Sequence, residues 1–132
     1  MYDQTLALDI LRQIDGALRK VKARVRQVSS AADLTATPEG EERLDGLCML
    51  FIAIGESLKN LDKITGGVLL ATCPEIDWKG AMGFRDVIAH RYFDIDADQV
   101  WWICSHEVVP LSAAIGAMIR HQERVIGSSP RS

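Results

Sequence analysis

The fold of this chain is decided by residues 37–61, TPEGEERLDGLCMLFIAIGESLKNL. Thr37, Pro38 and Glu39 are typical of a helix start, with a side-chain cap, a proline in the first turn and an acid near the positive end of the helix dipole. Apolar residues then recur at steps of three or four, at Leu44, Leu47, Phe51, Ile54, Leu58 and Leu61. This spacing predicts a helix of about 22 residues with one face turned towards a hydrophobic core.

A long amphipathic helix is predicted upstream, over residues 3–28. Its apolar positions again fall mostly three or four residues apart, at Leu8, Leu11, Leu18, Val21, Val25 and Val28. We expect this helix to stop before Ser29, because the small and polar residues from Ser29 to Thr37 are typical of a loop.

Downstream, glycine and proline divide the chain into shorter segments. Gly66-Gly67 and Cys73-Pro74 leave room for one short helical turn around residues 68–71. A third main helix is predicted from Trp78 to His90 or Arg91, with Asp77 as its cap, followed by a turn over residues 92–96. A last helix is expected over residues 97–125, with a kink or break at Pro110, because proline cannot donate the backbone hydrogen bond.

These elements predict an all-α fold, an antiparallel bundle of four main helices with a short extra helix and a kinked C-terminal helix. No segment shows the period-two alternation typical of strands. We expect a single domain over residues 1–126 and a flexible tail over residues 127–132. The consecutive apolar residues Trp101, Trp102 and Ile103 leave apolar surface that a homodimer would cover.

Composition narrows the class of protein. Apolar residues make up 48% and charged residues 25% of the 132, which is typical of a globular domain and excludes a disordered or fibrous chain. The longest apolar stretch is far shorter than the roughly 18 residues that span a bilayer, and the N-terminus lacks the basic region of a signal peptide. We therefore expect a soluble, cytoplasmic protein that does not enter a membrane.

Charge is unevenly distributed along the chain. The net charge is −3, but five cations and no acid lie within residues 19–26, so the remainder carries −8. These cations are Arg19, Lys20, Lys22, Arg24 and Arg26. Two interpretations stay open: a face that binds an RNA backbone or an acidic partner, or a solvated helix face near the negative end of the dipole.

Cysteine and histidine spacing does not favour a metal site. The three cysteines, Cys48, Cys73 and Cys104, are odd in number and contain no Cys-x-x-Cys pair, so we expect reduced and mostly buried thiols. His106 and His121 have no partner at a metal-ligand spacing. We expect neither a metal nor another cofactor.

The densest group of chemically active residues lies in the third main helix. Asp86 and His90 are four residues apart and share one helix face, where the carboxylate can orient the imidazole. Arg85 lies about 140° away from His90 around the helix axis. Arg85 and His90 can therefore share a site within one chain only through long side-chain reach or a distorted helix end, or else across a cleft between two copies.

Arginine, histidine and aspartate together are the parts of metal-independent RNA cleavage. The guanidinium binds a phosphate, the imidazole transfers a proton to or from the RNA's own 2′-hydroxyl, and the carboxylate orients the imidazole. The alternative from the residues alone is an ion-paired helix surface without chemistry.

The order of several short elements resembles the HepT family of HEPN-domain toxins. The elements run in the family's order, and Arg85, His90 and Tyr92 satisfy its diagnostic pattern of Arg, four residues, His, one residue, Tyr. The resemblance covers nearly the whole chain and includes Ile54-Gly55-Glu56-Ser57, Pro74-Glu75-Ile76-Asp77-Trp78, Gly83-Phe84-Arg85-Asp86, His90-Arg91-Tyr92-Phe93 and Val100-Trp101.

This resemblance implies the toxin of a type VII-like toxin–antitoxin pair, a homodimeric endoribonuclease that cleaves RNA such as tRNA or mRNA without a metal. His90 would be the acid and base, Arg85 would bind the scissile phosphate, and Asp86 would fill a position that is often Asn in relatives. The implied antitoxin is an MntA-like minimal nucleotidyltransferase, which would transfer AMP from ATP onto Tyr92 and so block RNA entry.

Two further residues are candidates for supporting roles. Arg91 would add positive charge to the cleft, and Glu56 is either a buried helper that pairs with a cation there or a solvated helix position. Two other functions stay open: a non-catalytic HEPN interaction module that binds the nucleotidyltransferase, and a helical adaptor unrelated to RNA.

Overall fold

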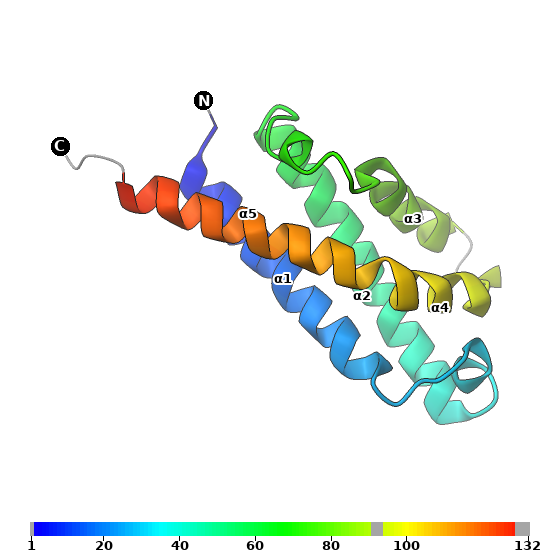
Figure 1. Ribbon diagram of the computed structural model, residues 1–132. Helices are drawn as coiled ribbons and strands as arrows, with labels where there is room; N and C mark the ends of the chain where they lie inside the picture. Colours follow the sequence, from blue (N-terminus) through cyan, green and yellow to red (C-terminus); the bar gives the residue numbers. More distant parts are fainter. Residues whose placement is uncertain (1, 91–93, 129–132) are drawn as a thin grey trace.

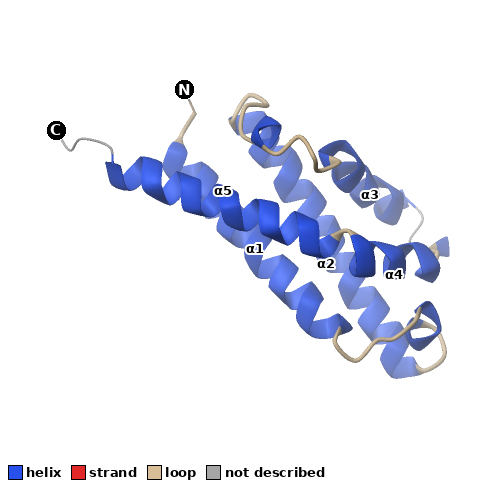
Figure 2. Ribbon diagram, in the orientation of Figure 1, coloured by secondary structure: helices blue, strands red, loops and turns tan. Residues whose placement is uncertain are grey.

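The decisive stretch forms the longest helix of the molecule, α2 (Pro38–Ile64). The computed structural model describes residues 2–90 and 94–128. Thr37 caps α2 as predicted, its Oγ1 accepting a 3.0 Å hydrogen bond from the N–H of Gly40. The other elements are α1 (Gln4–Val25), η1 (Ala31–Leu34), η2 (Leu70–Thr72), α3 (Trp78–His90), α4 (Ala97–His106) and α5 (Val108–Ser128), all helical (Figures 1 and 2).

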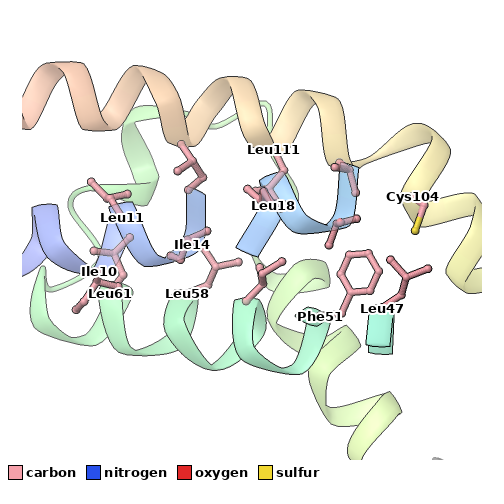
Figure 3. Packing of buried hydrophobic residues seen from close by; sticks show 14 of the residues in the cluster. Ile10, Leu11, Ile14, Leu18, Leu47, Phe51, Leu58, Leu61, Cys104 and Leu111 are labelled. Atoms are coloured by element: carbon pink, nitrogen blue, oxygen red, sulfur yellow. The ribbon is translucent and has the colours of Figure 1, made fainter. Parts of the chain in front are cut away.

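The all-α prediction is confirmed, since helices and no strands are found within the described ranges. The predicted stripe of α2 is buried from Leu47 to Leu61, and only Leu44 at its start is half-buried. Figure 3 shows this stripe facing Leu11, Ile14 and Leu18 of α1, beneath α5. The core therefore lies between α1, α2 and α5.

Helix α3 lies at the edge of this arrangement. Among the described elements, α2 is the one against which α3 packs extensively (Figure 1). Helix α1, in contrast, packs against both α2 and α5. The predicted site residues Arg85, Asp86 and His90 therefore lie on α3, which packs against fewer helices than α1 does.

The end of α1, the loop that follows it and the length of α2 differ from the prediction. Helix α1 ends at Val25 rather than Val28, and the expected loop contains the short helix η1, whose Leu34 is completely buried. Helix α2 is 27 residues long rather than about 22. It continues until Gly66 and Gly67, whose positive φ angles of 62° and 78° suit glycine and end a helix.

The predicted break near Pro110 is confirmed, but it falls between His106 and Val108. Helices α4 and α5 meet there at a bend of 48°. A proline ring clashes with the carbonyl four residues earlier in a helix, which here is that of His106. The break before Val108 places Pro110 in the first turn of α5, where no intrahelical N–H is required.

No single described helix is long and apolar enough to cross a membrane, and only the bent pair of α4 and α5 meets the criteria of length and composition. All three cysteines are free thiols, with Cys48 and Cys104 buried and Cys73 half-buried. The predicted tail begins at residue 127, whereas α5 continues to Ser128; residues 129–132 lie outside the described part.

Candidate functional site

The site predicted from the sequence lies in α3, and local interactions explain why this helix starts where it does. Asp77 caps α3 by accepting a 2.9 Å hydrogen bond from the N–H of Gly80. The Nε1–H of Trp78 donates to the carbonyl of Cys73 at 3.0 Å, which ties the first turn to the preceding loop. Near the other end, Ile88 is 1% exposed and anchors the helix in the core.

The structure describes only some of the motif residues. Arg85, Asp86 and His90 all belong to α3, so Asp86 and His90 are one turn apart in a helix as predicted. The side chains of Arg85 and His90 lie outside the described part, as do Arg91 and Tyr92 entirely. The proposed roles of these four residues stay predictions.

Asp86 is described, and it joins α3 to α2 through an ion pair. The Nζ of Lys59 lies 3.2 Å from each carboxylate oxygen of Asp86. Both side chains are about half exposed, at 41% and 44%. Lys59 thus brings a positive charge from α2 to the motif of α3.

Sequence reasoning did not single out Lys59. Its partner is 27 residues away, and no local pattern indicates which carboxylate a lysine on α2 will meet. The sequence could have shown only that Lys59 shares one helix face with Glu56 and Lys63, because these residues are three and four positions apart.

That face of α2 forms an open hollow of about 480 Å³. Every residue that lines it is polar, and two carry positive charge: Glu56, Ser57, Lys59, Asn60 and Lys63. Hydroxyl, amide and ammonium groups all donate hydrogen bonds, and such donors suit the sugar and phosphate oxygens of a nucleic acid.

Glu56 was expected either as a buried helper or at a solvated helix position. The structure places it at an exposed position among the residues that line the hollow, so it is not buried; its pairing with a cation of the cleft stays a prediction. Glu56 therefore contributes a negative charge to the same surface as Lys59 and Lys63.

In the basic run over residues 19–26, two cations have side-chain partners among the described residues. The Nζ of Lys22 donates a 2.6 Å hydrogen bond to the Oγ of Ser112, and so links α1 to α5. Arg19 lies 3.0 Å from Asp15 in its own helix. Lys22 thus links two helices, whereas the Arg19 pair lies within α1 and leaves the arginine side chain largely exposed.

A second pocket, of about 220 Å³, is lined by acidic side chains, unlike the hollow on α2 with its two lysines. It lies between the beginning of α3 and the junction of α4 with α5, and it is lined by Glu75, Ile76, Asp77, Ala81, His106, Glu107, Pro110 and Leu111. Burial and the nearby Asp77 raise the pKa of Glu107, although His106 lowers it in part. Three acids make this pocket unsuited to a phosphate.

The remaining histidines have ordinary surroundings. His106 stacks on Trp102, with ring centroids 4.9 Å apart, and its Nδ1 is 3.1 Å from the Trp102 carbonyl. His121 is exposed on α5. Within residues 2–90 and 94–128, no three His, Cys, Asp or Glu side chains are grouped so that they could hold a metal ion.

Comparison with known proteins provides the family. A family model described as "Ribonuclease HepT-like" matches residues 14–118, which include all of α2, α3 and α4 and the Lys59–Asp86 pair. No solved structure matches this chain. Membership of such a family implies a ribonuclease of the toxin type, with an MntA-type antitoxin as the partner that the family has in general. Because the match covers most of its length, the chain belongs to the HepT-like ribonuclease family.

Proposed function

We propose that this protein is the toxin of a type VII-like toxin–antitoxin pair and cleaves cytoplasmic RNA, such as tRNA or mRNA, as a metal-independent endoribonuclease. The observation that carries the proposal is the family match over residues 14–118, which spans the helix that contains Arg85, Asp86 and His90. The polar hollow beside this helix supports it, because its donors suit a sugar–phosphate backbone.

His90 acts as the base that removes the proton from a ribose 2′-hydroxyl. The 2′-oxygen then attacks the adjacent phosphorus, and the bond from phosphorus to the 5′-oxygen of the next nucleotide breaks. A proton returns to that oxygen, which leaves a 2′,3′-cyclic phosphate and a free 5′-hydroxyl. The guanidinium of Arg85 binds the phosphate and stabilises the negative charge that develops on it.

Two copies of the chain form the complete active site. Five residues along a helix place Arg85 and His90 about 140° apart, so one helix alone does not present both to one phosphate without long side-chain reach or distortion. A homodimer removes this difficulty, because the motifs of two α3 helices meet in one cleft. Arg91 adds positive charge at its edge.

The antitoxin is an MntA-like minimal nucleotidyltransferase that transfers AMP from ATP to the phenol oxygen of Tyr92. The phenol oxygen attacks the α-phosphorus of ATP, pyrophosphate leaves, and the phenol proton is released. The added nucleotide places bulk and negative charge two residues from His90, which opposes the entry of RNA.

Cleavage is tested by incubating the purified protein with tRNA and mRNA in the presence of EDTA. We expect cleavage by the wild type and its loss in His90→Ala. His121→Ala is the matched control, since His121 is an exposed histidine on α5, and it should cleave normally. An unmodified dimer that cleaves no RNA would refute the ribonuclease and favour the non-catalytic interaction module.

Modification is tested by measuring intact mass after incubation with ATP and a purified MntA-like minimal nucleotidyltransferase. We expect increments of AMP on the wild type and none on Tyr92→Phe. Tyr2→Phe is the matched control, because Tyr2 is the other tyrosine in the chain, and it should be modified normally. An unchanged wild-type mass contradicts the proposed regulation.

A further inference from the structure

One of the two lysines in the hollow on α2 has a charge that is available to a ligand. Lys59 has its ammonium 3.2 Å from both carboxylate oxygens of Asp86. Lys63 is exposed, and within residues 2–90 and 94–128 no Asp or Glu forms an ion pair with it. Its ammonium can therefore bind an anion without first giving up a partner in the chain.

The lining of the hollow changes in character along α2. Glu56 precedes Lys63 by seven residues, which is two helical turns and about 10 Å along the axis. Ser57 and Asn60 fall between them in the sequence and line the same hollow. Their hydroxyl and amide groups both donate and accept hydrogen bonds. The cation and the acid thus lie at opposite ends of the hollow, with neutral polar groups between them.

The end of α2 beside Lys63 is less negative than an uncapped helix C-terminus, whose unpaired carbonyl oxygens repel anions. The Lys63 carbonyl accepts a 3.3 Å hydrogen bond from the N–H of Gly66, and the Asp62 carbonyl accepts one of 3.0 Å from that of Gly67. The Asp62 carboxylate does not line the hollow. The turn at the two glycines therefore occupies carbonyls that would oppose a phosphate near Lys63.

The hollow is continuous with the α3 motif. Lys59 lines it and pairs with Asp86, which directly follows Arg85 in the sequence. An RNA strand whose scissile phosphate is bound by Arg85 can therefore pass its next nucleotides over this face of α2. Proteins that bind single-stranded nucleic acids commonly do so with a positively charged groove that follows the backbone.

We propose that the hollow is a subsite for the nucleotides next to the scissile bond, in which Lys63 binds a phosphate and Ser57 and Asn60 bind ribose hydroxyls. This inference rests on the proposed function and places part of substrate binding on α2, outside the Arg-His-Tyr motif. Contacts to phosphate and sugar add affinity without selecting a base sequence. The 2′-hydroxyl both donates and accepts hydrogen bonds, so the polar lining favours RNA over DNA.

The phosphate contact is tested by binding a fluorescein-labelled single-stranded RNA oligonucleotide at several salt concentrations, measured by fluorescence anisotropy. All proteins carry His90→Ala so that the RNA stays intact. For Lys63→Met in this background we expect the Kd at low salt to rise about threefold, as for the loss of one exposed ion pair. The logarithm of the affinity should also fall less steeply with the logarithm of the salt concentration, by about 0.7 for one phosphate contact to a single strand.

Lys79→Met is the matched control. Lys79 is also an exposed lysine, but it lies in the first turn of α3 and does not line the hollow, so Kd and slope should stay unchanged. Lys63→Arg keeps the charge and should retain both values as well. A slope that Lys63→Met leaves unchanged, or that Lys79→Met lowers equally, overturns the phosphate contact.

The sugar contacts are tested by comparing RNA with DNA of the same sequence. Asn60→Ala should raise the Kd for RNA about threefold, as for one lost hydrogen bond, and leave the Kd for DNA unchanged because deoxyribose lacks the 2′-hydroxyl. Equal weakening for both nucleic acids contradicts a contact to the 2′-hydroxyl.

Cleavage by protein that retains His90 separates this inference from the proposed function. If the wild type cleaves RNA while the slope does not depend on Lys63, only the subsite is overturned. If the wild type cleaves no RNA but the slope does depend on Lys63, the ribonuclease is refuted and the hollow stands as an RNA-binding surface.

Discussion

Helices α1 and α3 both pack against α2, but they are held in different ways. Helix α1 is also covered by α5 and buries seven residues, from Ala7 to Val21. In α3, Ile88 is the one buried residue among the side chains that the structure describes. The 220 Å³ pocket also borders the first turns of α3, which shows that its start is less tightly packed.

The helices that contribute most to stability are therefore not the helix that contains the proposed catalytic residues. The free energy of folding comes mainly from the apolar area buried between α1, α2 and α5. The proposed catalytic residues lie on the helix with fewer such contacts, and elements of this kind open with a lower free energy than the core. Substitutions in the core between α1, α2 and α5 should therefore lower the free energy of unfolding, whereas substitutions in α3 should mainly change the local opening of that helix.

The largest effect on stability is expected for Leu58→Ala. Leu58 is completely buried and lies in the cluster between α1 and α2 (Figure 3). Truncation of a buried leucine removes apolar contacts and leaves a cavity, which costs about 2–5 kcal/mol. Urea denaturation should show this loss, and a cost below about 1 kcal/mol would contradict the assignment of the core to these helices.

Ile88→Ala should have a smaller effect on global stability, of about 2 kcal/mol, because a helix at the edge can relax towards the space left behind. The effect should be local to α3. In hydrogen exchange, we expect the amides of α3 to lose protection while those of α1 keep it. Equal loss of protection in both helices would mean that α3 and the core unfold together.

Thiol reactivity gives a third comparison of core and periphery. Burial raises the pKa of Cys48 to about 11 and that of Cys104 to about 12. At pH 8 roughly one in a thousand or fewer of these thiols is ionised, and only the thiolate reacts. Iodoacetamide should therefore modify the half-buried Cys73 alone, as intact mass would show, and Cys73→Ser should remain unmodified. Rapid labelling of Cys48 or Cys104 would indicate that the core opens readily.

The smallest effect is expected at Glu107, in the pocket beside the start of α3. Its pKa is raised in the folded state, so folded protein binds more protons than unfolded protein above about pH 4.5. Its contribution to stability therefore falls as pH rises through this range. Glu107→Gln should raise the Tm by roughly 1–2 °C at pH 7 and leave it unchanged at pH 4. Glu42→Gln, at an exposed position on α2, should change neither.

Much of the architecture could be predicted because it depends on local signals. The spacing of Leu47, Phe51 and Leu58 indicated both the helix and its buried face, and Pro110 indicated the break between α4 and α5. Helix η1 was missed because Leu34 is a single apolar residue among small and polar ones. Its burial depends on packing against distant parts of the chain, which no local pattern reveals.

In the candidate site, too, local spacing could be predicted but contacts between distant residues could not. The spacing of Arg85, Asp86 and His90 in one helix could be predicted from the sequence, since a helix repeats every 3.6 residues. The contact of Asp86 with Lys59 could not, because it depends on the register of α3 against α2. The partner of this motif residue is therefore set by how α3 packs against α2, not by the motif itself.

The packing of α1 against α5 also determines when the protein can fold during synthesis. Contacts such as Tyr2 with Gln122 and Arg12 with Glu123 join residues more than 100 positions apart. Translation proceeds from the N-terminus, so the ribosome completes α1, α2 and α3 before α5 exists. Until α5 emerges, the α1 surface that it covers has no partner. A nascent chain that already contains the whole Arg-His-Tyr motif therefore still lacks part of its core until α5 has left the ribosome.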